Sequence, residues 1–404
     1  MPVFPSSRPN PQLAFATTPA EGANPCHTLV CVFLRGGADT LNVWVPYADD
    51  AYYRQRPNIA IPRPGNARDA AIKLTNSYGL HPALRPLEAA FGEGRLGAVQ
   101  SVGLDNTSGS HFECQDQMEH GDSAEGPQAG GGWLGRFLRV KHLERSPLCA
   151  VAIGTALPES LRGAPSASVM ERIGDISLKA PAGNATNIQA ALGALYGADT
   201  GLLGQFGRQT LSLFQRISAL QASSYVPENG AAYGKDDFST GLSEIARLIK
   251  ARVGLEVACI DLGGWDTHFF QGASSGLQAN RLGTLSAGLA AFDSDMKGHR
   301  PHYTVIITTE FGRRIYENAS LGTDHGRGFA FTALGDKVRG GRILGAWPAE
   351  ATDESNPMGP GGLLPSTDFR DVFAEVLRSC HGLSAQQTAL IFPGANLAPI
   401  GLMA

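Results

Sequence analysis

The sequence predicts an α/β protein with a mostly parallel central sheet and helices on both of its faces. Three apolar runs of strand length, at 29–34, 257–262 and 305–308, each end in a polar loop that contains glycine. Segments with helical spacing of their apolar residues, such as 242–252 and 282–296, separate these runs. Strands that alternate with helices are typical of parallel sheets. Apolar runs without alternation are typical of strands buried on both faces.

The remaining elements follow from the same two patterns along the chain. Residues 96–102 form a fourth short apolar run, and polar residues 105–110 follow it. Residues 221–238 are polar and contain turn formers, so we expect a surface loop there instead of a domain linker. The expected strands are 28–34, 96–102, 257–262 and 305–308, and the expected helical segments are 84–91, 133–140, 187–220, 242–252, 282–296 and 372–377.

Composition limits the class of protein before any motif is considered. The chain has 404 residues, with 33 Lys and Arg against 37 Asp and Glu, and a net charge of -4. Proteins that bind nucleic acids through charge need a basic surface, so we expect no nucleic-acid partner. No apolar run approaches the ~18 residues of a membrane span, so we expect no transmembrane segment. The sequence does not indicate an oligomeric state.

The first residues of the chain differ from the rest. Residues 1–27 are rich in proline and lack periodicity, so we expect a flexible arm or a leader remnant, followed by one α/β domain with loop insertions over 28–404. Residues 13–16 look like the end of an export leader, although the basic start and apolar stretch of such leaders do not precede them. A trimmed leader and a chance likeness both remain open.

Acidic and histidine residues follow the predicted strands. In open α/β sheets, ligands bind at the carboxyl ends of the strands, so these side chains should converge. Asp and His ligands suit Zn²⁺ or Mn²⁺, with Mg²⁺ and Ca²⁺ as alternatives, in a site with one or two metals. The alternative is that the histidines are ordinary loop residues. The candidate ligands are Asp39, Asp266, His268, Glu310, Asp324 and His325.

The segment 106–111 can supply a nucleophile, because it carries Thr107, Ser110 and His111. A hydroxyl near neutral pH needs a metal or a base to become a good nucleophile. Ser110 also has the position of a helix N-cap, and the two roles are compatible. Arg35 and Arg313 can neutralise the oxygens of a phosphate or sulfate ester, or they can form structural salt bridges.

Six ordered motifs together resemble the DUF1501 family. The resemblance runs from about residue 28 to residue 383, and the family is grouped with the alkaline phosphatase and sulfatase-like superfamily. Thr40 and Trp265 stand where family members usually have Gly and Phe. The motifs are Leu34–Asp39 (LRGGAD), Ser110–Phe112 (SHF), Gly132–Arg136 (GWLGR), Gly264–His268 (GWDTH), Glu310–Arg313 (EFGR) and Gly322–Gly326 (GTDHG).

The resemblance implies an alkaline phosphatase-like fold, and it implies roles for individual residues. Asp324 and His325 look like the superfamily's adjacent metal ligands, Asp39 like the aspartate after the first strand, and Asp266 with His268 like the pair on another metal. Similarity to cofactor-independent phosphoglycerate mutases nominates Thr107 as nucleophile, whereas the DUF1501 pattern stresses Ser110 and His111. Family members are commonly exported, often behind a twin-arginine leader.

We therefore expect a metal-dependent hydrolase of phosphate or sulfate esters that acts on a small-molecule or glycan ester. The formylglycine signature of one sulfatase class is missing at all six cysteines, so that class is not expected. The alternatives are a non-catalytic exported binding or assembly protein on the same fold and a sugar phosphomutase. The expected location is periplasmic or extracellular, with the cytoplasm as the alternative.

Overall fold

The core of the protein is one large sheet whose strands are mostly parallel. The computed structural model describes residues 26–124, 129–141, 148–176, 184–222, 224–345 and 362–404, so all of the predicted arm except its last two residues lies outside the described part. In the described part, the strand order is β11-β5-β10-β9-β1-β8-β6-β7, with β12 beside β5. The strands are β1 (Thr28–Arg35), β5 (Leu96–Gly103), β6 (Ala150–Ile153), β7 (Ser168–Met170), β8 (Val257–Gly263), β9 (Tyr303–Thr308), β10 (Phe329–Gly335), β11 (Ile343–Leu344) and β12 (Thr367–Asp368).

The central strand β1 pairs in parallel with β8 on one side and with β9 on the other. Its side chains alternate between two apolar layers: Val30 and Val32 point into one, and Leu29 and Phe33 into the other. This strand is therefore buried on both faces, as an uninterrupted apolar run predicts. Among the described strands of this sheet, only β10 runs antiparallel to its neighbours, which are β5 and β9. The predicted mostly parallel sheet is confirmed.

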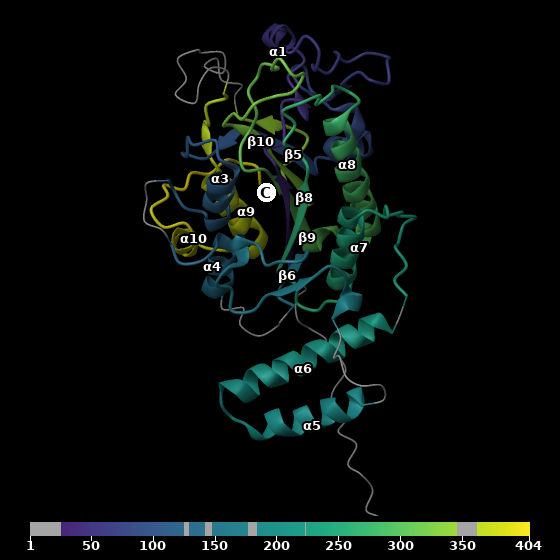
Figure 1. The fold of residues 1–404 in the computed structure, drawn as a ribbon, viewed down its shortest axis with the longest axis vertical. Coiled ribbons are helices and arrows are strands. Elements are labelled where there is room, and N and C mark those ends of the chain that lie inside the picture. Colours follow the sequence, from purple (N-terminus) through teal and green to yellow (C-terminus); the bar gives the residue numbers. More distant parts are fainter. Residues whose placement is uncertain (1–25, 125–128, 142–147, 177–183, 223, 346–361) are drawn as a thin grey trace, which may run out of the picture.

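Helices cover both faces of the sheet (Figure 1). One face carries α7 (Asp237–Lys250) and α8 (Leu277–Asp295), which share an apolar cluster with β1 and β8. The opposite face carries α3 (His111–His120), α4 (Trp133–Val140), α9 (Phe369–His381) and α10 (Ala385–Ile391). The predicted helices at 133–140 and 242–252 and the C-terminal helix have counterparts in α4, α7 and α9. No helix within the described ranges has the length and apolar character needed to cross a membrane.

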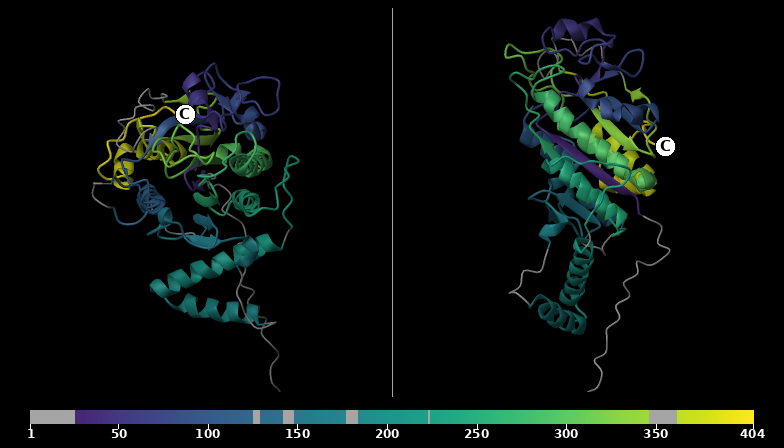
Figure 2. Two further views of the ribbon diagram at one scale, coloured as in Figure 1. Left: turned by 45° about the horizontal axis from the view of Figure 1, so that its top comes forward. Right: turned by 90° about the vertical axis from the view of Figure 1, so that its right-hand side faces the viewer.

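Two helical predictions need correction. The segment 84–91 is a 3₁₀ helix, η1 (Pro82–Leu87), followed by the short helix α2 (Glu88–Gly92), because Pro86 removes a backbone donor inside it. The segment 187–220 is two helices, α5 (Ala185–Ala198) and α6 (Leu202–Gln221). They pair as a hairpin that projects from the body of the domain (Figures 1 and 2).

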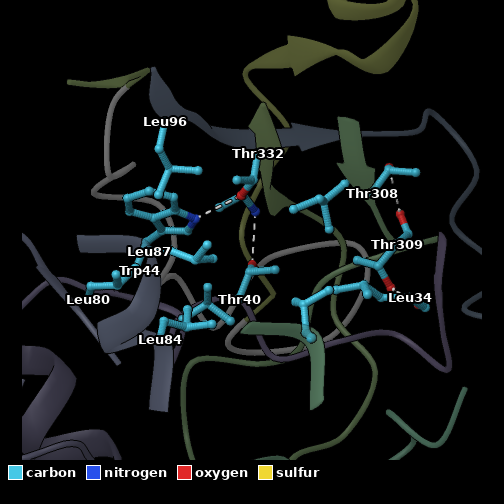
Figure 3. A pocket seen from close by; sticks show the side chains of 14 residues that line it. Leu34, Thr40, Trp44, Leu80, Leu84, Leu87, Leu96, Thr308, Thr309 and Thr332 are labelled. Atoms are coloured by element: carbon cyan, nitrogen blue, oxygen red, sulfur yellow. Dashed lines mark hydrogen bonds between the residues drawn. The ribbon is translucent and has the colours of Figure 1, made fainter. Parts of the chain in front are cut away.

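A small second sheet, which begins with β2 (Trp44–Val45), packs against the domain core through Trp44, Ile72 and Leu80. Its Val45 shares a smaller apolar cluster with Tyr52 of α1 (Asp50–Gln55). Its strand β2 carries Trp44, whose indole Nε1 donates to Thr332 Oγ1 on β10 over 2.9 Å (Figure 3). Leucines line the void beside this bond, whose volume is about 30 Å³, so it has room for about one water molecule. The remaining elements are β3 (Ile72–Lys73), β4 (Gly79–Leu80), η2 (Glu159–Leu161), η3 (Ile173–Asp175) and η4 (Lys297–His302).

Candidate metal site

The site lies where the carboxyl ends of β1, β8 and β9 meet the N-terminus of α3. Asp266 and His268 follow β8, Glu310 follows β9, and His111 is the first residue of α3. The loop that carries Asp324 and His325 leads into β10. These segments are far apart in sequence, and the parallel sheet brings them to one edge, as predicted from the position of polar residues after apolar runs.

Glycine allows the loops to approach this closely. Gly36 has a φ of +119°, and a Cβ there would lie 2.6 Å from the backbone nitrogen of Asp266. A Cβ at Gly322 would lie 2.3 Å from the carbonyl of His268. Any larger residue at either position would push the end of β1, or the loop of Asp324, away from the loop after β8.

Three histidine rings converge on the carboxylate of Asp266. His268 Nε2 lies 3.0 Å from Asp266 Oδ1, His325 Nε2 lies 3.3 Å from the same oxygen, and His111 Nε2 lies 3.5 Å from Oδ2. His268 Nε2 and His325 Nε2 are only 2.9 Å apart. Ligand atoms of His111, Asp266 and His325 all lie within 4.8 Å of one another.

The other nitrogen of each ring faces an oxygen that can only accept a hydrogen bond. His111 Nδ1 lies 2.7 Å from Glu310 Oε1, and His268 Nδ1 lies 2.9 Å from Asp324 Oδ1. His325 Nδ1 lies 2.8 Å from the carbonyl oxygen of Gly109. Since carboxylates and carbonyls only accept, each Nδ1 carries a hydrogen. In the neutral form of such a ring, Nε2 keeps a lone pair that can bind a cation.

This donor set fits a divalent cation. A tetrahedral ion with bonds of about 2.0–2.1 Å keeps its ligand atoms roughly 3.3–3.4 Å apart, close to the separations around Asp266. His111 Nε2 is buried and has no hydrogen-bond partner among the described residues. Histidines that bind metal through Nε2 usually donate Nδ1–H to a carboxylate or a backbone carbonyl, which is the arrangement found at all three rings.

The pKa values of Asp266, His111 and His325 are shifted, each for a different physical reason. Burial acts to raise the pKa of Asp266, but the hydrogen bond and charge of Arg313 outweigh it and hold this pKa at about 2. The hydrogen bond to Glu310 raises the pKa of His111, against the effect of burial. Burial lowers the pKa of His325, and Arg313 adds to this effect. Asp266 is therefore a carboxylate throughout the physiological pH range.

Arg313 is fully buried and fixes the loops instead of facing open space. Its guanidinium donates to Asp266 Oδ1 over 2.6 Å, to the carbonyls of Gly36 and Gly37, and to the carbonyl of Thr323 over 2.8 Å. One side chain thus ties the end of β1, the loop after β8 and the loop of Asp324 together. The sequence-based prediction placed Arg313 on ester oxygens, and the structure places it behind Asp266.

Asp39 lies apart from the cluster. Both of its oxygens pair with Arg56, at 2.6 and 3.0 Å, and neither side chain has any exposed surface. Gln271 Nε2 donates to the same carboxylate over 2.7 Å. The structure gives the Asp39 carboxylate to this buried pair, and it does not bring the residue together with His111, Asp266, and the other rings.

Glu310 and Asp324, which the sequence suggested as ligands, contact the cluster through histidines. Glu310 is fully buried and also accepts from the backbone nitrogen of Gly36 and from Gln115 Nε2, both at 2.9 Å. Burial acts to raise its pKa, but the hydrogen bond from His111 and further donors lower it overall. Both carboxylates therefore orient histidine rings. The side chain beside Asp266 is instead His111, whose Nε2 faces Asp266 Oδ2.

Of the predicted nucleophiles and of Arg35, only Ser110 lies next to residues of the cluster. Ser110 is the N-cap of α3, where its Oγ accepts from Glu113 N over 3.4 Å, and it lies between Gly109 and His111, which both contact the cluster. Thr107 is exposed in the preceding loop. Arg35 pairs with Glu119 at 3.1 Å and with Asp261 at 2.5 Å, so its charge is already neutralised.

Two features beside the cluster were not predicted from the sequence. Phe112 follows His111, and Phe269 and Phe270 follow His268; their side chains are 87%, 64% and 71% exposed, and we call these three residues the phenylalanine rim. In the sequence, these residues can be recognised only as aromatic residues close to a candidate ligand. A cavity of about 640 Å³ lies one turn further along α3, and Gln115 belongs to its wall while it donates to Glu310. The charged residues of its wall are Arg35, Glu119, Glu159, Glu171, Arg172, Asp237 and Asp261.

Comparison with known proteins establishes the family. The model of the family described as "Protein of unknown function (DUF1501)" matches residues 89–370, which is more than half of the chain. The chain belongs to the DUF1501 family. The match includes every residue of the cluster around Asp266, and it leaves β1 and its glycine-rich loop outside. A search among curated proteins found no match for this DUF1501 protein.

Three solved structures are among those to which this DUF1501 chain is similar. The C-terminal periplasmic domain of EcEptC from Escherichia coli, in complex with Zn, is 11% identical with a TM-score of 0.35, covering 78% of this chain and 74% of that one. The PsFucS1 sulfatase from Pseudoalteromonas sp. is 13% identical with a TM-score of 0.35, covering 94% and 73%. Alkaline phosphatase from the Antarctic bacterium TAB5 is 9% identical with a TM-score of 0.28, covering 80% and 95%. Likeness at this level says nothing about the chemistry of this chain.

Proposed function

We propose that this protein is a metal-dependent hydrolase of phosphate or sulfate esters. The observation that carries the proposal is the convergence of three Nε2 atoms on Asp266 while each Nδ1 is held by an outer acceptor. Loop histidines without a common ligand would not be expected to share one ring orientation. The proposed ligands are His111, Asp266, His268 and His325, and the proposed ion is Zn²⁺ or Mn²⁺, because imidazole and carboxylate together suit these ions.

When bound, the ion would supply Lewis acidity toward an ester oxygen and toward a hydroxyl or water nucleophile. The chain itself supplies orientation. Ser110 is the hydroxyl that lies next to His111 in the chain, and its Oγ can donate a proton while it accepts from Glu113 N. Backbone N–H groups at the N-terminus of α3 favour an anionic group there. We therefore propose Ser110 as the attacking hydroxyl in place of the exposed Thr107.

The surroundings of the cluster support an organic ester of moderate size as substrate. The phenylalanine rim offers exposed aromatic faces beside His111 and His268, on which an apolar face of a small molecule or of a glycan ring can rest. A volume of about 640 Å³ lies within the range of small-molecule pockets.

The test combines metal analysis with turnover. Protein purified without added metal, and after dialysis against Zn²⁺ or Mn²⁺, is assayed for bound metal and for hydrolysis of an aryl phosphate and an aryl sulfate. We expect bound metal and turnover in the wild type, metal without turnover in Ser110→Ala, and neither in His325→Ala. His299→Ala, on η4 at the opposite end of β9, is the matched control and should behave as the wild type.

Other outcomes lead to the alternatives. Stoichiometric metal without turnover on any ester would favour a non-catalytic binding or assembly protein, and transfer to a second hydroxyl would favour a sugar phosphomutase. A wild-type protein that binds no metal would defeat the proposal. We also propose that the protein is exported, because residues 13–16 look like the end of a leader. Fractionation of host cells that express the natural gene tests this location.

A further inference from the structure

A buried glutamine connects the two loops that carry the proposed metal ligands. Gln271 has no exposed surface, and its Oε1 accepts from Thr267 Oγ1 over 2.8 Å and from Thr323 Oγ1 over 2.7 Å. Thr267 and Thr323 are 3% and 0% exposed. The orientation of the amide is unambiguous, because its Nε2 faces the Asp39 carboxylate, which can only accept.

The two threonines occupy informative positions. Thr267 lies between Asp266 and His268, and Thr323 directly precedes Asp324 and His325. The backbone nitrogen of Thr323 also donates to the carbonyl of Thr267 over 3.2 Å. A shift of either hydroxyl therefore moves a backbone segment whose neighbouring residues are proposed ligands or hold a ligand ring in place.

The opposite end of the glutamine is held equally firmly. Asp39 accepts from Gln271 Nε2 over 2.7 Å and from Arg56 at 2.6 and 3.0 Å, and Gln278 Nε2 donates to its carbonyl over 2.7 Å. Every member of this chain of contacts is buried, so water does not compete for its hydrogen bonds. The Arg56–Asp39 pair thus provides a fixed point at the end of β1.

We infer that Gln271 is a positioning residue, which sets the separation of the Asp266–His268 loop and the Asp324–His325 loop through Thr267 and Thr323. The inference rests on the proposed function, because it concerns the geometry of the same metal site. The distance that it controls is the 2.9 Å between the Nε2 atoms of His268 and His325.

The experiment removes single hydroxyls without changing volume. Thr267→Val and Thr323→Val each delete one hydrogen bond to Gln271, while Thr267→Ser and Thr323→Ser retain it. Co²⁺ affinity and the visible spectrum of the Co²⁺-loaded protein report the metal site. Since outer partners of metal ligands typically contribute 10–100-fold in affinity, we expect about a tenfold loss and a changed spectrum in each valine variant, and wild-type behaviour in each serine variant.

Thr332→Val is the matched control, because the buried hydroxyl of Thr332 lies on β10, outside the ligand loops, where it accepts from Trp44 Nε1 of β2. It should lower stability and leave Co²⁺ affinity unchanged. Equal loss of affinity in Thr332→Val would overturn the inference, because the effect would then be general destabilisation. Wild-type affinity and spectra in both Thr267→Val and Thr323→Val would overturn it as well.

A second measurement needs no metal. The ¹⁵N signals of the histidine rings in metal-free protein report which ring nitrogen carries hydrogen. The inference predicts that Thr267→Val and Thr323→Val shift the ring signals of His268 and His325. If the wild type binds no metal and these shifts occur, the proposed function fails and the positioning role stands. If the ring signals do not change, the positioning role fails whatever the metal content.

Discussion

The replacement Asp39→Asn separates two interpretations of this residue. As a metal ligand, Asp39 would be needed for metal binding and would matter little for stability. In the structure, its carboxylate instead neutralises Arg56, and both side chains are completely buried. Asn keeps an oxygen that can accept from Gln271 and removes the charge that faces the guanidinium. The replacement therefore tests the ion pair while it retains the contact with the loop after β8.

The magnitude follows from what remains buried. Removing one partner of a buried ion pair leaves an uncompensated charge and typically costs about 3–5 kcal/mol of unfolding free energy. The guanidinium keeps bonds to Asn42 Oδ1 and to the carbonyls of Arg314 and Ile315, which moderate the loss and place it near the lower end of that range. We expect a decrease of about 3 kcal/mol in Asp39→Asn.

Urea unfolding followed by circular dichroism measures the stability, and elemental analysis after dialysis against Zn²⁺ measures the metal. The double variant with Arg56→Gln removes both charges, so its loss should be clearly smaller than the sum of the two single losses. A variant that unfolds like the wild type but contains no metal would refute the reasoning and would make Asp39 a ligand. Wild-type metal content with reduced stability is the expected result.

Three further predictions concern the cluster, the rim and acid stability. Asp324→Ala should lower Zn²⁺ affinity by about 10–100-fold with unchanged stoichiometry at saturation, since its carboxylate only orients a ring; equilibrium dialysis that finds no saturable site would make it a ligand. Phe269→Ala should raise KM several-fold with kcat unchanged, and an unchanged KM would remove the rim from the binding site. Burial lowers the pKa of His81 from 6.5 to about 4. The unfolded chain alone takes up that proton between these values, so stability falls by about 1.4 kcal/mol per pH unit as the pH drops through this window. His81→Gln should flatten the profile measured by urea unfolding, and an unaltered slope would contradict this assignment.

Sequence patterns predicted the parts of the fold in which burial requires apolar residues. The strands β1, β8 and β9 consist mostly of buried residues because helices cover both faces of the sheet, although the exposed Asp261 interrupts the apolar run of β8. The polar loops after these strands mark the edge of the sheet at which ligands bind in such folds. The split of residues 187–220 into two helices was missed. The helical spacing of apolar residues continues across residues 199–201, where α5 has ended and α6 has not yet begun. Residues 329–335 were not predicted as a strand, and no pattern in that run gives a strand direction, so the antiparallel β10 was missed.

The structure brings most of the predicted site residues together at the predicted edge of the sheet, but their contacts could not be read from the sequence. Loop motifs identify Asp266, His268 and His325, since carboxylate and imidazole groups flanked by glycine stand out. The roles of Glu310 and Asp324 depend on which ring nitrogen each one faces, and residue type carries no information about that. Asp39 pairs with a partner 17 residues away that no motif contains. Its sequence position is shared by metal ligands and by buried ion-pair members.

The separation of 2.9 Å between His268 Nε2 and His325 Nε2 carries the chemical argument furthest. Both Nδ1 atoms already donate, to Asp324 and to the carbonyl of Gly109, so two neutral rings would direct lone pairs at each other. Such a contact is repulsive unless a positive charge lies between the rings. A proton can provide it by making one ring cationic beside Asp266, and a divalent cation can provide it for both rings at once. A single divalent cation would therefore remove the repulsion at both rings, which supports the metal site that we propose.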